Sequence, residues 1–307
     1  MNYYVAAAAL RALSAHSALR RTYRWVGNRR RSFRVAIPKT RWIWEQVTTE
    51  GVDTKGHTLL ELGTGWIHGG SLYSALLVDA AIIAFDVWDC RSLYCTKNEI
   101  ARVAEAIQGA EGHSASDKKR ASERAAAALR AKTFPELYDV LNIKYLVDES
   151  GLPPIPEASV DLIYSQDVLE HVNRSDFIFA IEAWKRVLKP SGRFLALVGL
   201  DDHLAHYDSS KSMKEYLYHS ELVWKHLLNN RLQYINRLTA TEIVDLFQRN
   251  GFDIEDVGVE RCSVELARVR PCYKWQAQED LEATCLKLYA RAGTVNRCNG
   301  SQLRTTK

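Results

Sequence analysis

From Lys55 onward, short β-rich runs alternate with helical patterns, and this alternation constrains the fold more than any other feature of the chain. Such an alternation is typical of βαβ units, which form a mostly parallel sheet with helices on both faces. We expect strands at residues 58–62, 81–86, 143–146, 160–165, 193–198, 252–260 and 284–290. The sequence therefore predicts an α/β protein with a doubly wound, Rossmann-like sheet of seven strands.

Helical patterns fill the segments between these strands. Residues 97–142 predict a long helical insertion between the second and third strands, which is either structural or a wall of the site. Residues 204–238 carry aromatic and apolar side chains at helical spacing and interrupt the sheet after the fifth strand. Thr239 and Glu242 match a capping box that begins a helix, and Asn250 and Gly251 end it.

These patterns predict three parts of the chain. Residues 1–50 form a basic helical extension, residues 51–292 form one α/β domain with a substrate cover at about 201–238, and residues 293–307 form a polar tail. The first 44 residues contain ten Lys or Arg and no Asp or Glu, whereas residues 45–307 contain 31 basic and 37 acidic side chains. The positive charge is therefore local, which argues against a nucleic-acid-binding body.

The basic N-terminal segment has three interpretations that its composition does not separate. It is a helix packed on the main domain, an anchor at a membrane surface, or an organelle transit peptide. Peripheral membrane contact through this segment thus remains open, whereas the apolar run at 80–85 is far too short to span a bilayer. Six cysteines without a C-x-x-C pair, and no compact apolar signal segment, predict reduced thiols and a cytoplasmic protein.

The first predicted strand runs into a glycine-rich turn that contains Gly63 and Gly65. Ligands of open α/β sheets bind at the carboxyl ends of the strands, and a glycine lets the backbone approach a ligand closely, although tight packing also selects glycine. Asp86 ends the second predicted strand, 23 residues after Gly63. A carboxylate there can accept hydrogen bonds from both ribose hydroxyls, so the pair indicates an adenosine-containing ligand.

Two such ligands fit, a dinucleotide and S-adenosyl-L-methionine. The dinucleotide fingerprint requires a third glycine five positions after the first, where this chain has His68. Glu61, just before the turn, suits a cationic ligand, and S-adenosyl-L-methionine carries an ammonium group and a sulfonium. The turn therefore favours S-adenosyl-L-methionine.

Six segments, in this order, resemble class I S-adenosylmethionine-dependent methyltransferases, most closely the branch of the quinone-biosynthesis methyltransferases. They are Glu61-x-Gly63-x-Gly65, Asp86, and residues 152–156, 160–165, 168–172 and 188–194. The resemblance covers about residues 55–200. It departs from the family at Ile67, where the third glycine of the family's turn is missing, and this concerns the shape of the loop more than the cofactor.

The resemblance implies S-adenosyl-L-methionine as the cofactor and a set of residues that bind it. Glu61 and the turn of Gly63, Thr64 and Gly65 would border the methionine part, and Asp86 would hold the ribose hydroxyls. The remaining implied contacts are Trp88 beside the adenine, Asp148 (or Glu149) at the adenine amino group, and Ser165 and Gln166 beneath the transferred methyl group. Ser165 and Gln166 also fit an ordinary strand end.

Residues 199–208 place His203 and His206 among three carboxylates at the edge of the expected acceptor pocket. Methyl transfer mainly requires alignment of the nucleophile, the methyl carbon and the sulfur, but a hydroxyl nucleophile also needs a base, and a histidine can serve. We expect His203 and His206 to be catalytic, with His203 preferred. His203, His206 and Asp208 could also ligate a divalent ion, but their spacing imposes no coordination geometry, so we expect no metal.

His171, which follows an acidic residue, is equally a structural hydrogen-bonding residue or an acceptor contact. Residues 202–208 and 234–238 have a fainter similarity to methyltransferases encoded with bacterial surface-glycan assembly, which implies a sugar or glycolipid hydroxyl as acceptor. Arg237 would then meet a phosphate or carboxylate, unless it forms a surface ion pair.

The sequence thus predicts a methyltransferase that acts on a small-molecule, glycan-linked or lipid-linked acceptor, preferably at oxygen. Carbon methylation of a quinone-like ring and a non-catalytic S-adenosylmethionine-binding protein are the alternatives.

Overall fold

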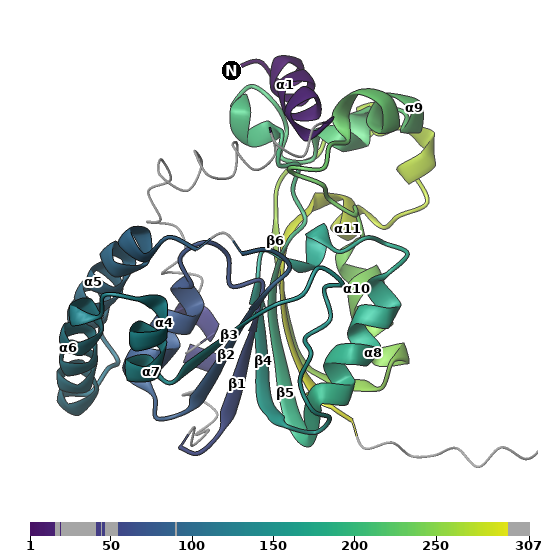
Figure 1. Ribbon diagram of the computed structural model, residues 1–307. Helices are drawn as coiled ribbons and strands as arrows, with labels where there is room; N and C mark the ends of the chain where they lie inside the picture. The colour runs from purple at the N-terminus through teal and green to yellow at the C-terminus, as the bar shows by residue number, and fades with distance from the viewer. Residues whose placement is uncertain (16–18, 20–40, 44, 47–54, 90, 294–307) are drawn as a thin grey trace, which may run out of the picture.

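The computed structural model describes residues 1–15, 19, 41–43, 45–46, 55–89 and 91–293. In these segments a seven-stranded sheet has the order β3-β2-β1-β4-β5-β7-β6, with β7 antiparallel to both of its neighbours and the other pairs parallel (Figure 1). The strands are β1 (Thr58–Leu62), β2 (Ala81–Asp86), β3 (Ile143–Val147), β4 (Val160–Gln166), β5 (Leu188–Gly199), β6 (Phe252–Arg261) and β7 (Ala283–Ala292). The predicted fold class is confirmed.

The direction of chain progression across the sheet reverses between β1 and β4. The chain runs outward from β1 to β2 and β3, and then returns to place β4 on the other side of β1. In open α/β sheets, ligands bind outside the carboxyl ends of the strands at such a reversal. The glycine turn after β1 therefore lies where the fold is expected to bind a ligand.

The apolar strand sequences follow from helices that cover both faces of the sheet. Successive side chains of β1 point to opposite faces, so Leu59 packs in one core and Leu60 in the other. The first core lies under α4 (Gly69–Leu77), α5 (Leu93–Gly109) and α7 (Phe134–Leu141), and the second under α8 (Phe177–Val187) and α10 (Ala240–Arg249) (Figure 1).

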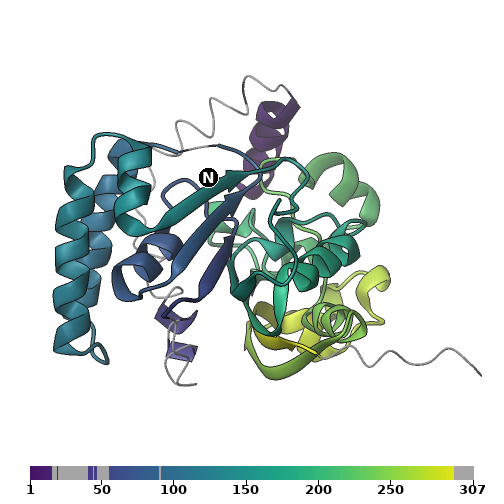
Figure 2. The same ribbon diagram turned by 60° about the horizontal axis from the view of Figure 1, so that its bottom comes forward.

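The predicted helical insertion between β2 and β3 consists of α5, α6 (Ala115–Arg130) and α7. Helix α6 packs on α4, α5 and α7 and forms an outer layer, as Figure 2 shows from a second side. Ala121, Ala125 and Ala128 are its buried face, and these small side chains allow close helix packing. The predicted capping box is also present, because Thr239 and Glu242 exchange side-chain-to-backbone hydrogen bonds at the start of α10.

Five of the seven strands differ from the predicted bounds, and for β3, β4, β6 and β7 the difference is at most two residues at an end. Strand β5 begins at Leu188, five residues before the expected start, because Leu188 pairs with Val160 across an irregularity in the β4–β5 ladder. Pro190 and Gly192 lie between Leu188 and Arg193, where the irregular ladder accommodates both residues.

Residues 204–238 fold into short helical turns rather than one long helix. These are η2 (Ala205–Tyr207), η3 (Glu215–Tyr218), α9 (Glu221–Val223) and η4 (Trp224–Leu228). Helix α1 (Tyr3–Ala15) lies beside them at one end of the sheet (Figure 1). Tyr3 and Leu10 of α1 share an apolar cluster with Tyr216 and Trp224, so α1 is a packed helix, as one of the three interpretations predicts.

The arginine runs at 20–21 and 29–31, and two of the six cysteines, Cys90 and Cys298, lie outside the described residues. The same holds for almost all of the predicted polar tail. Among the helices that the structure describes, none has the length and apolar character needed to cross a bilayer.

Candidate cofactor and acceptor site

The turn after β1 is fixed to the end of β2 by three backbone amides. The amides of Gly63 and Thr64 donate hydrogen bonds to the carbonyl oxygen of Phe85, at 2.9 and 3.0 Å. The amide of Gly65 donates to Oδ2 of Asp86 at 2.8 Å. Gly63 and Gly65 both adopt the left-handed backbone conformation, with φ of 70° and 66°. The sharp turn thus requires glycine at both positions.

The two glycines nevertheless differ in what surrounds them. A Cβ atom at Gly63 would lie 2.2 Å from a methyl carbon of Val168, whereas a Cβ atom at Gly65 would have no neighbour within 4 Å. Gly63 is therefore explained by tight packing against the segment after β4. Gly65 borders open space at the carboxyl edge of the sheet, where a ligand can approach the backbone.

Glu61 lies beneath this turn and is 5% exposed. Its Oε2 accepts hydrogen bonds from Oγ1 of Thr64 at 2.7 Å, from the amide of Ser71 at 2.8 Å, and from the Ser71 hydroxyl. Burial raises the pKa of Glu61, and the hydrogen bonds from Ser71 and Thr64 oppose that rise. Glu61 thus joins the turn to the first residues of α4, and its predicted contact with the methionine part stays a prediction.

His68, which stands where the dinucleotide fingerprint has glycine, takes up a glycine-like backbone with φ of 56° and is fully buried. Its Nδ1 lies 3.1 Å from Oγ1 of Thr64 and its Nε2 lies 2.9 Å from the hydroxyl of Tyr138. Burial lowers the pKa of His68 to about 3, so the ring is neutral at pH 7. Because Tyr138 belongs to α7, the helical insertion supports the turn from behind.

The other predicted adenosine contacts gather at the same edge of the sheet. The Asp86 carboxylate also accepts from the amides of Val87 and Trp88, and the Asp86 carbonyl accepts from the amide of Asp148 at 3.1 Å. The indole of Trp88 is 44% exposed and available to an adenine ring. Open backbone at Gly65, an acceptor for ribose hydroxyls and an exposed aromatic face together fit the adenosine part of S-adenosyl-L-methionine.

The end of β4 lies next to this turn, since Val168 packs on Gly63. Ser165 is fully buried, with Oγ 3.5 Å from the carbonyl oxygen of Leu62, which fits the structural explanation of this strand end. Gln166 is partly buried and follows it. The roles of both residues toward the cofactor therefore stay predictions.

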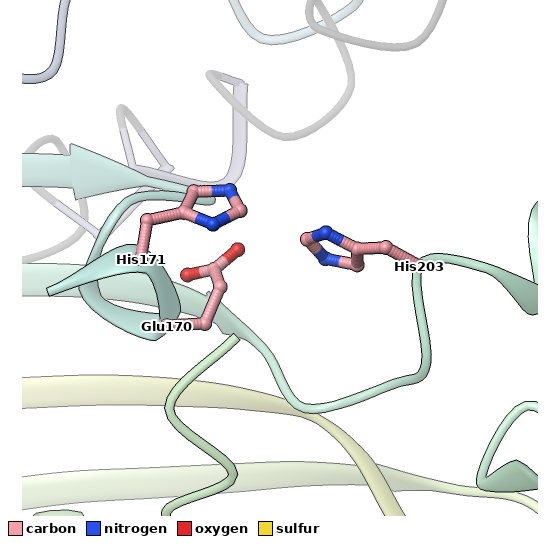
Figure 3. Close-up of side chains that lie close together, drawn as sticks. All are labelled: Glu170, His171 and His203. Atoms are coloured by element: carbon pink, nitrogen blue, oxygen red, sulfur yellow. The ribbon is translucent and has the colours of Figure 1, made fainter. Parts of the chain in front are cut away.

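Three side chains from the ends of β4 and β5 point into one space, as Figure 3 shows: Glu170, His171 and His203. Each offers a ligand atom, and these atoms lie within 4.8 Å of one another. The rings of His171 and His203 stand edge to face, 5.1 Å apart. Glu170 is a residue that sequence reasoning passed over, although it lies inside the 168–172 motif that carries the resemblance.

His206 faces a different partner. Its Nε2 lies 2.6 Å from Oδ2 of Asp201, whose side chain is largely buried. Burial opposes ionisation of Asp201, but the hydrogen bond with His206 and the nearby His203 lower its pKa overall. An imidazole oriented by a carboxylate is the arrangement that general-base catalysis uses.

Asp208 does not join the two imidazoles, so the grouping of His203, His206 and Asp208 considered from the sequence is wrong. The Asp208 carboxylate accepts from the amide of Tyr3 at 3.1 Å and from Ser210, because helix α1 docks on this loop. Among the described residues, the metal-ligand grouping of His203 is instead with Glu170 and His171.

Asp202, next to His203, anchors the same loop. Its Oδ2 accepts a hydrogen bond from the Tyr3 hydroxyl at 2.7 Å and its Oδ1 accepts from the amide of Leu204 at 3.0 Å. Burial raises the pKa of Asp202 to about 6. Helix α1 is thus connected to the loop that carries both candidate catalytic histidines.

A small pocket adjoins this cluster. Its lining includes Glu170, Asp201 and residues 235–238. Arg237 lies at this pocket, but its guanidinium is paired with Glu221 at 2.9 Å and lies over the ring of Trp224. The ion-pair explanation of Arg237 therefore accounts for its position.

Comparison with known proteins identifies one domain family. A family model described as a methyltransferase domain matches residues 114–196, which include β3, β4, Glu170 and His171 but not the turn after β1. No curated protein matches the chain.

Several solved structures are similar to the chain. A candidate sarcosine dimethylglycine methyltransferase from Galdieria sulphuraria has 15% identity and a TM-score of 0.48, over 83% of this chain and 84% of that one. The cyclase SpnF has 14% identity and a TM-score of 0.47, over 86% and 84%. A SAM-dependent methyltransferase from Methanosarcina mazei has 15% identity and a TM-score of 0.46, over 80% and 97%.

The methyltransferase-domain match, the strand order and the open turn at Gly65 and Asp86 indicate a methyltransferase that uses S-adenosyl-L-methionine as its cofactor.

Proposed function

We propose that this S-adenosylmethionine-dependent methyltransferase methylates an oxygen atom of a small-molecule or glycan-linked acceptor. The observation that carries this proposal is the 2.6 Å pair of His206 and Asp201, which lies beside His203 at the end of β5. An oxygen nucleophile has a proton to lose during methyl transfer, and a carboxylate-oriented imidazole can accept it. Carbon methylation of a quinone-like ring is the weaker candidate, because only the resemblance to that branch supports it.

The described residues divide the work between two neighbouring groups of strand ends. Gly65, Asp86, Trp88 and Asp148 would hold the adenosine part at the ends of β1, β2 and β3. When bound, S-adenosyl-L-methionine supplies an electrophilic methyl group. The acceptor would lie against the ends of β4 and β5, so that its oxygen forms a bond to the methyl carbon as the carbon–sulfur bond breaks.

The order of the two candidate bases follows from their partners. The sequence ranked His203 first, but the carboxylate partner found for His206 supports the opposite order. If the Nε2–H of His206 donates to Asp201, then Nδ1 of the neutral ring has a lone pair and accepts the acceptor's proton. Asp201 would also stabilise the imidazolium ion that forms.

We also propose that the chain divides into three parts. These are an extension at 1–50, a methyltransferase domain at 51–292 with its cover at about 201–238, and a tail at 293–307. The protein works in the cytoplasm, which is supported by the six cysteines of the sequence and their lack of a C-x-x-C pair. A lipid-linked acceptor would also allow peripheral membrane contact through the basic N-terminal segment.

The test is transfer of an isotope-labelled methyl group to fractionated cell extract, followed by identification of the labelled product. We expect a methyl ether, the product of methylating a hydroxyl group. The His206→Asn variant should reduce turnover by about 100-fold or more, the usual effect of losing a general base. His226→Asn changes an exposed histidine on η4 and should leave turnover unchanged. A label on carbon, or an unaffected His206→Asn enzyme, would contradict the proposal.

A further inference from the structure

We propose that Glu170, His171 and His203 bind a divalent transition-metal ion at the acceptor side of the site. This inference deepens the proposed function, because the ion would hold the acceptor oxygen. The ligand atoms of the three side chains lie within 4.8 Å of one another, and Figure 3 shows all three turned toward a common space. Glu170 and His171 belong to η1 (Leu169–His171) after β4, and His203 belongs to the loop after β5. Because β4 and β5 pair in the sheet, the start of each of these two segments is held in place.

The donor set selects the kind of ion. Two imidazole nitrogens and one carboxylate oxygen suit zinc, cobalt, nickel, manganese or ferrous iron rather than magnesium or calcium, which prefer oxygen ligands. Bonds from such ions to nitrogen and oxygen are about 2.0–2.2 Å long. The three ligand atoms therefore have to approach by about 1 Å or somewhat more, which is within reach of side-chain rotation at His203 on its loop.

A hydrogen bond fixes the tautomer of His171 in the form that a metal ligand needs. Nδ1 of His171 lies 2.5 Å from the carbonyl oxygen of Tyr234. A carbonyl oxygen only accepts hydrogen bonds, so Nδ1 carries the proton and the lone pair of the neutral ring resides on Nε2. Metal-binding histidines commonly donate their second ring nitrogen to a carbonyl or carboxylate in this way.

The surroundings of Glu170 favour a cation. Glu170 is 2% exposed and lies near the carboxylate of Asp201. Gly199 makes this proximity possible, because a Cβ atom there would lie 2.9 Å from Oε1 of Glu170 and 3.3 Å from Oδ1 of Asp201. Arg237, at the same pocket, directs its guanidinium to Glu221. A positive ion would stabilise the two neighbouring and largely buried carboxylates of Glu170 and Asp201.

The ion would complete the acceptor site. Three protein ligands leave coordination positions open, and a five- or six-coordinate ion could accept two neighbouring oxygens of a diol-like acceptor. Coordination lowers the pKa of a bound hydroxyl group, so the oxygen would lose its proton to His206 and attack the methyl carbon more readily. His203 would then be a ligand and the His206–Asp201 pair the proton acceptor.

The test measures metal binding directly, without turnover. Purified wild-type protein is treated with a chelator, dialysed and titrated with cobalt(II), whose visible absorption reports nitrogen and oxygen coordination. We expect one ion per chain. His203→Asn, at the partly buried histidine of the cluster, and Glu170→Gln should each weaken binding at least tenfold. His226→Asn should bind cobalt as the wild type does.

Each variant is also titrated with S-adenosylhomocysteine, because unchanged affinity shows that the fold and the cofactor turn are intact. Wild-type protein that binds no stoichiometric cobalt, or His203→Asn protein that binds it as tightly as the wild type, would overturn the metal site. If the chelated protein binds no cobalt but still methylates oxygen, the proposed function stands and the metal site is wrong. If the protein binds cobalt but transfers no methyl group to oxygen, the metal site stands and the proposed function is wrong.

Discussion

The amide nitrogen of Gly65 lies 2.8 Å from Oδ2 of Asp86, and this hydrogen bond joins the turn after β1 to the last residue of β2. The two residues that the sequence associates with an adenosine ligand are thus in direct contact. Gly65 provides open space above its backbone, and Asp86 provides the acceptor for ribose hydroxyls beside that space. The conformation of the turn and the position of the carboxylate are therefore coupled.

Substitution of Gly65 by alanine should weaken cofactor binding. Alanine is strained at φ of 66°, by about 1–2 kcal/mol, and its methyl group would project into the space above the turn. We expect the dissociation constant for S-adenosylhomocysteine, measured by calorimetry, to rise at least tenfold.

Gly112→Ala is the matched control, because Gly112 also has a positive φ and open space around it but lies between α5 and α6. This variant should lose a comparable amount of stability and keep the wild-type affinity. Equal affinities in the two variants would show that Gly65 does not border the ligand.

Helix α1 should contribute to the stability of the loop that carries His203. Tyr3→Phe removes the 2.7 Å hydrogen bond to the buried Asp202 carboxylate and should lower the free energy of unfolding by about 1–3 kcal/mol in chemical denaturation. Tyr4→Phe, at a residue that is 46% exposed, should change it by less than about 0.5 kcal/mol. A Tyr3→Phe protein as stable as the wild type would mean that α1 does not anchor the loop.

The stability of the protein should depend on pH through His68. Its pKa is about 3 in the folded protein, against an ordinary value of 6.5. Between these values the unfolded chain binds more protons at this residue, so the free energy of unfolding falls as the pH is lowered from about 6.5, by up to about 1.4 kcal/mol per pH unit.

His68→Asn should remove this contribution, and asparagine tolerates the positive φ of the position. Urea denaturation across the range from pH 7 to 4 measures the slope for the wild type, for His68→Asn and for the exposed-site control His226→Asn. Identical slopes in all three proteins would show that His68 is not buried in its neutral form.

The central strands were predictable because local sequence determines them. The bounds of β1 and β2 agree with the prediction, since each apolar run ends at a glycine turn or an acidic residue. The start of β5 was not predictable, because an irregular pairing between Val160 and Leu188 sets it.

The arrangement of the histidines depends on contacts between distant segments. Glu170 and His171 follow β4 while His203 follows β5, so only the strand pairing brings them together. Asp208 is drawn away from the histidines by Tyr3, more than 200 residues earlier in the chain. The spacing of residues along the sequence predicts neither the histidine cluster nor the contact between Asp208 and Tyr3. The turn at Gly63 and Gly65 is local, so it was recognisable from the sequence.

The central claim is that Asp86 and the glycine turn hold the nucleoside of S-adenosyl-L-methionine, and a calorimetric titration with S-adenosylhomocysteine tests it most directly. Asp86→Asn keeps an oxygen for the amide of Gly65, loses the second oxygen that accepts from the amides of Val87 and Trp88, and removes the charge that strengthens hydrogen bonds from ribose hydroxyls. We predict saturable binding of one ligand per wild-type chain, and an affinity about 10- to 100-fold lower in Asp86→Asn. No saturable binding to the wild type, or the same affinity in both proteins, would contradict the account.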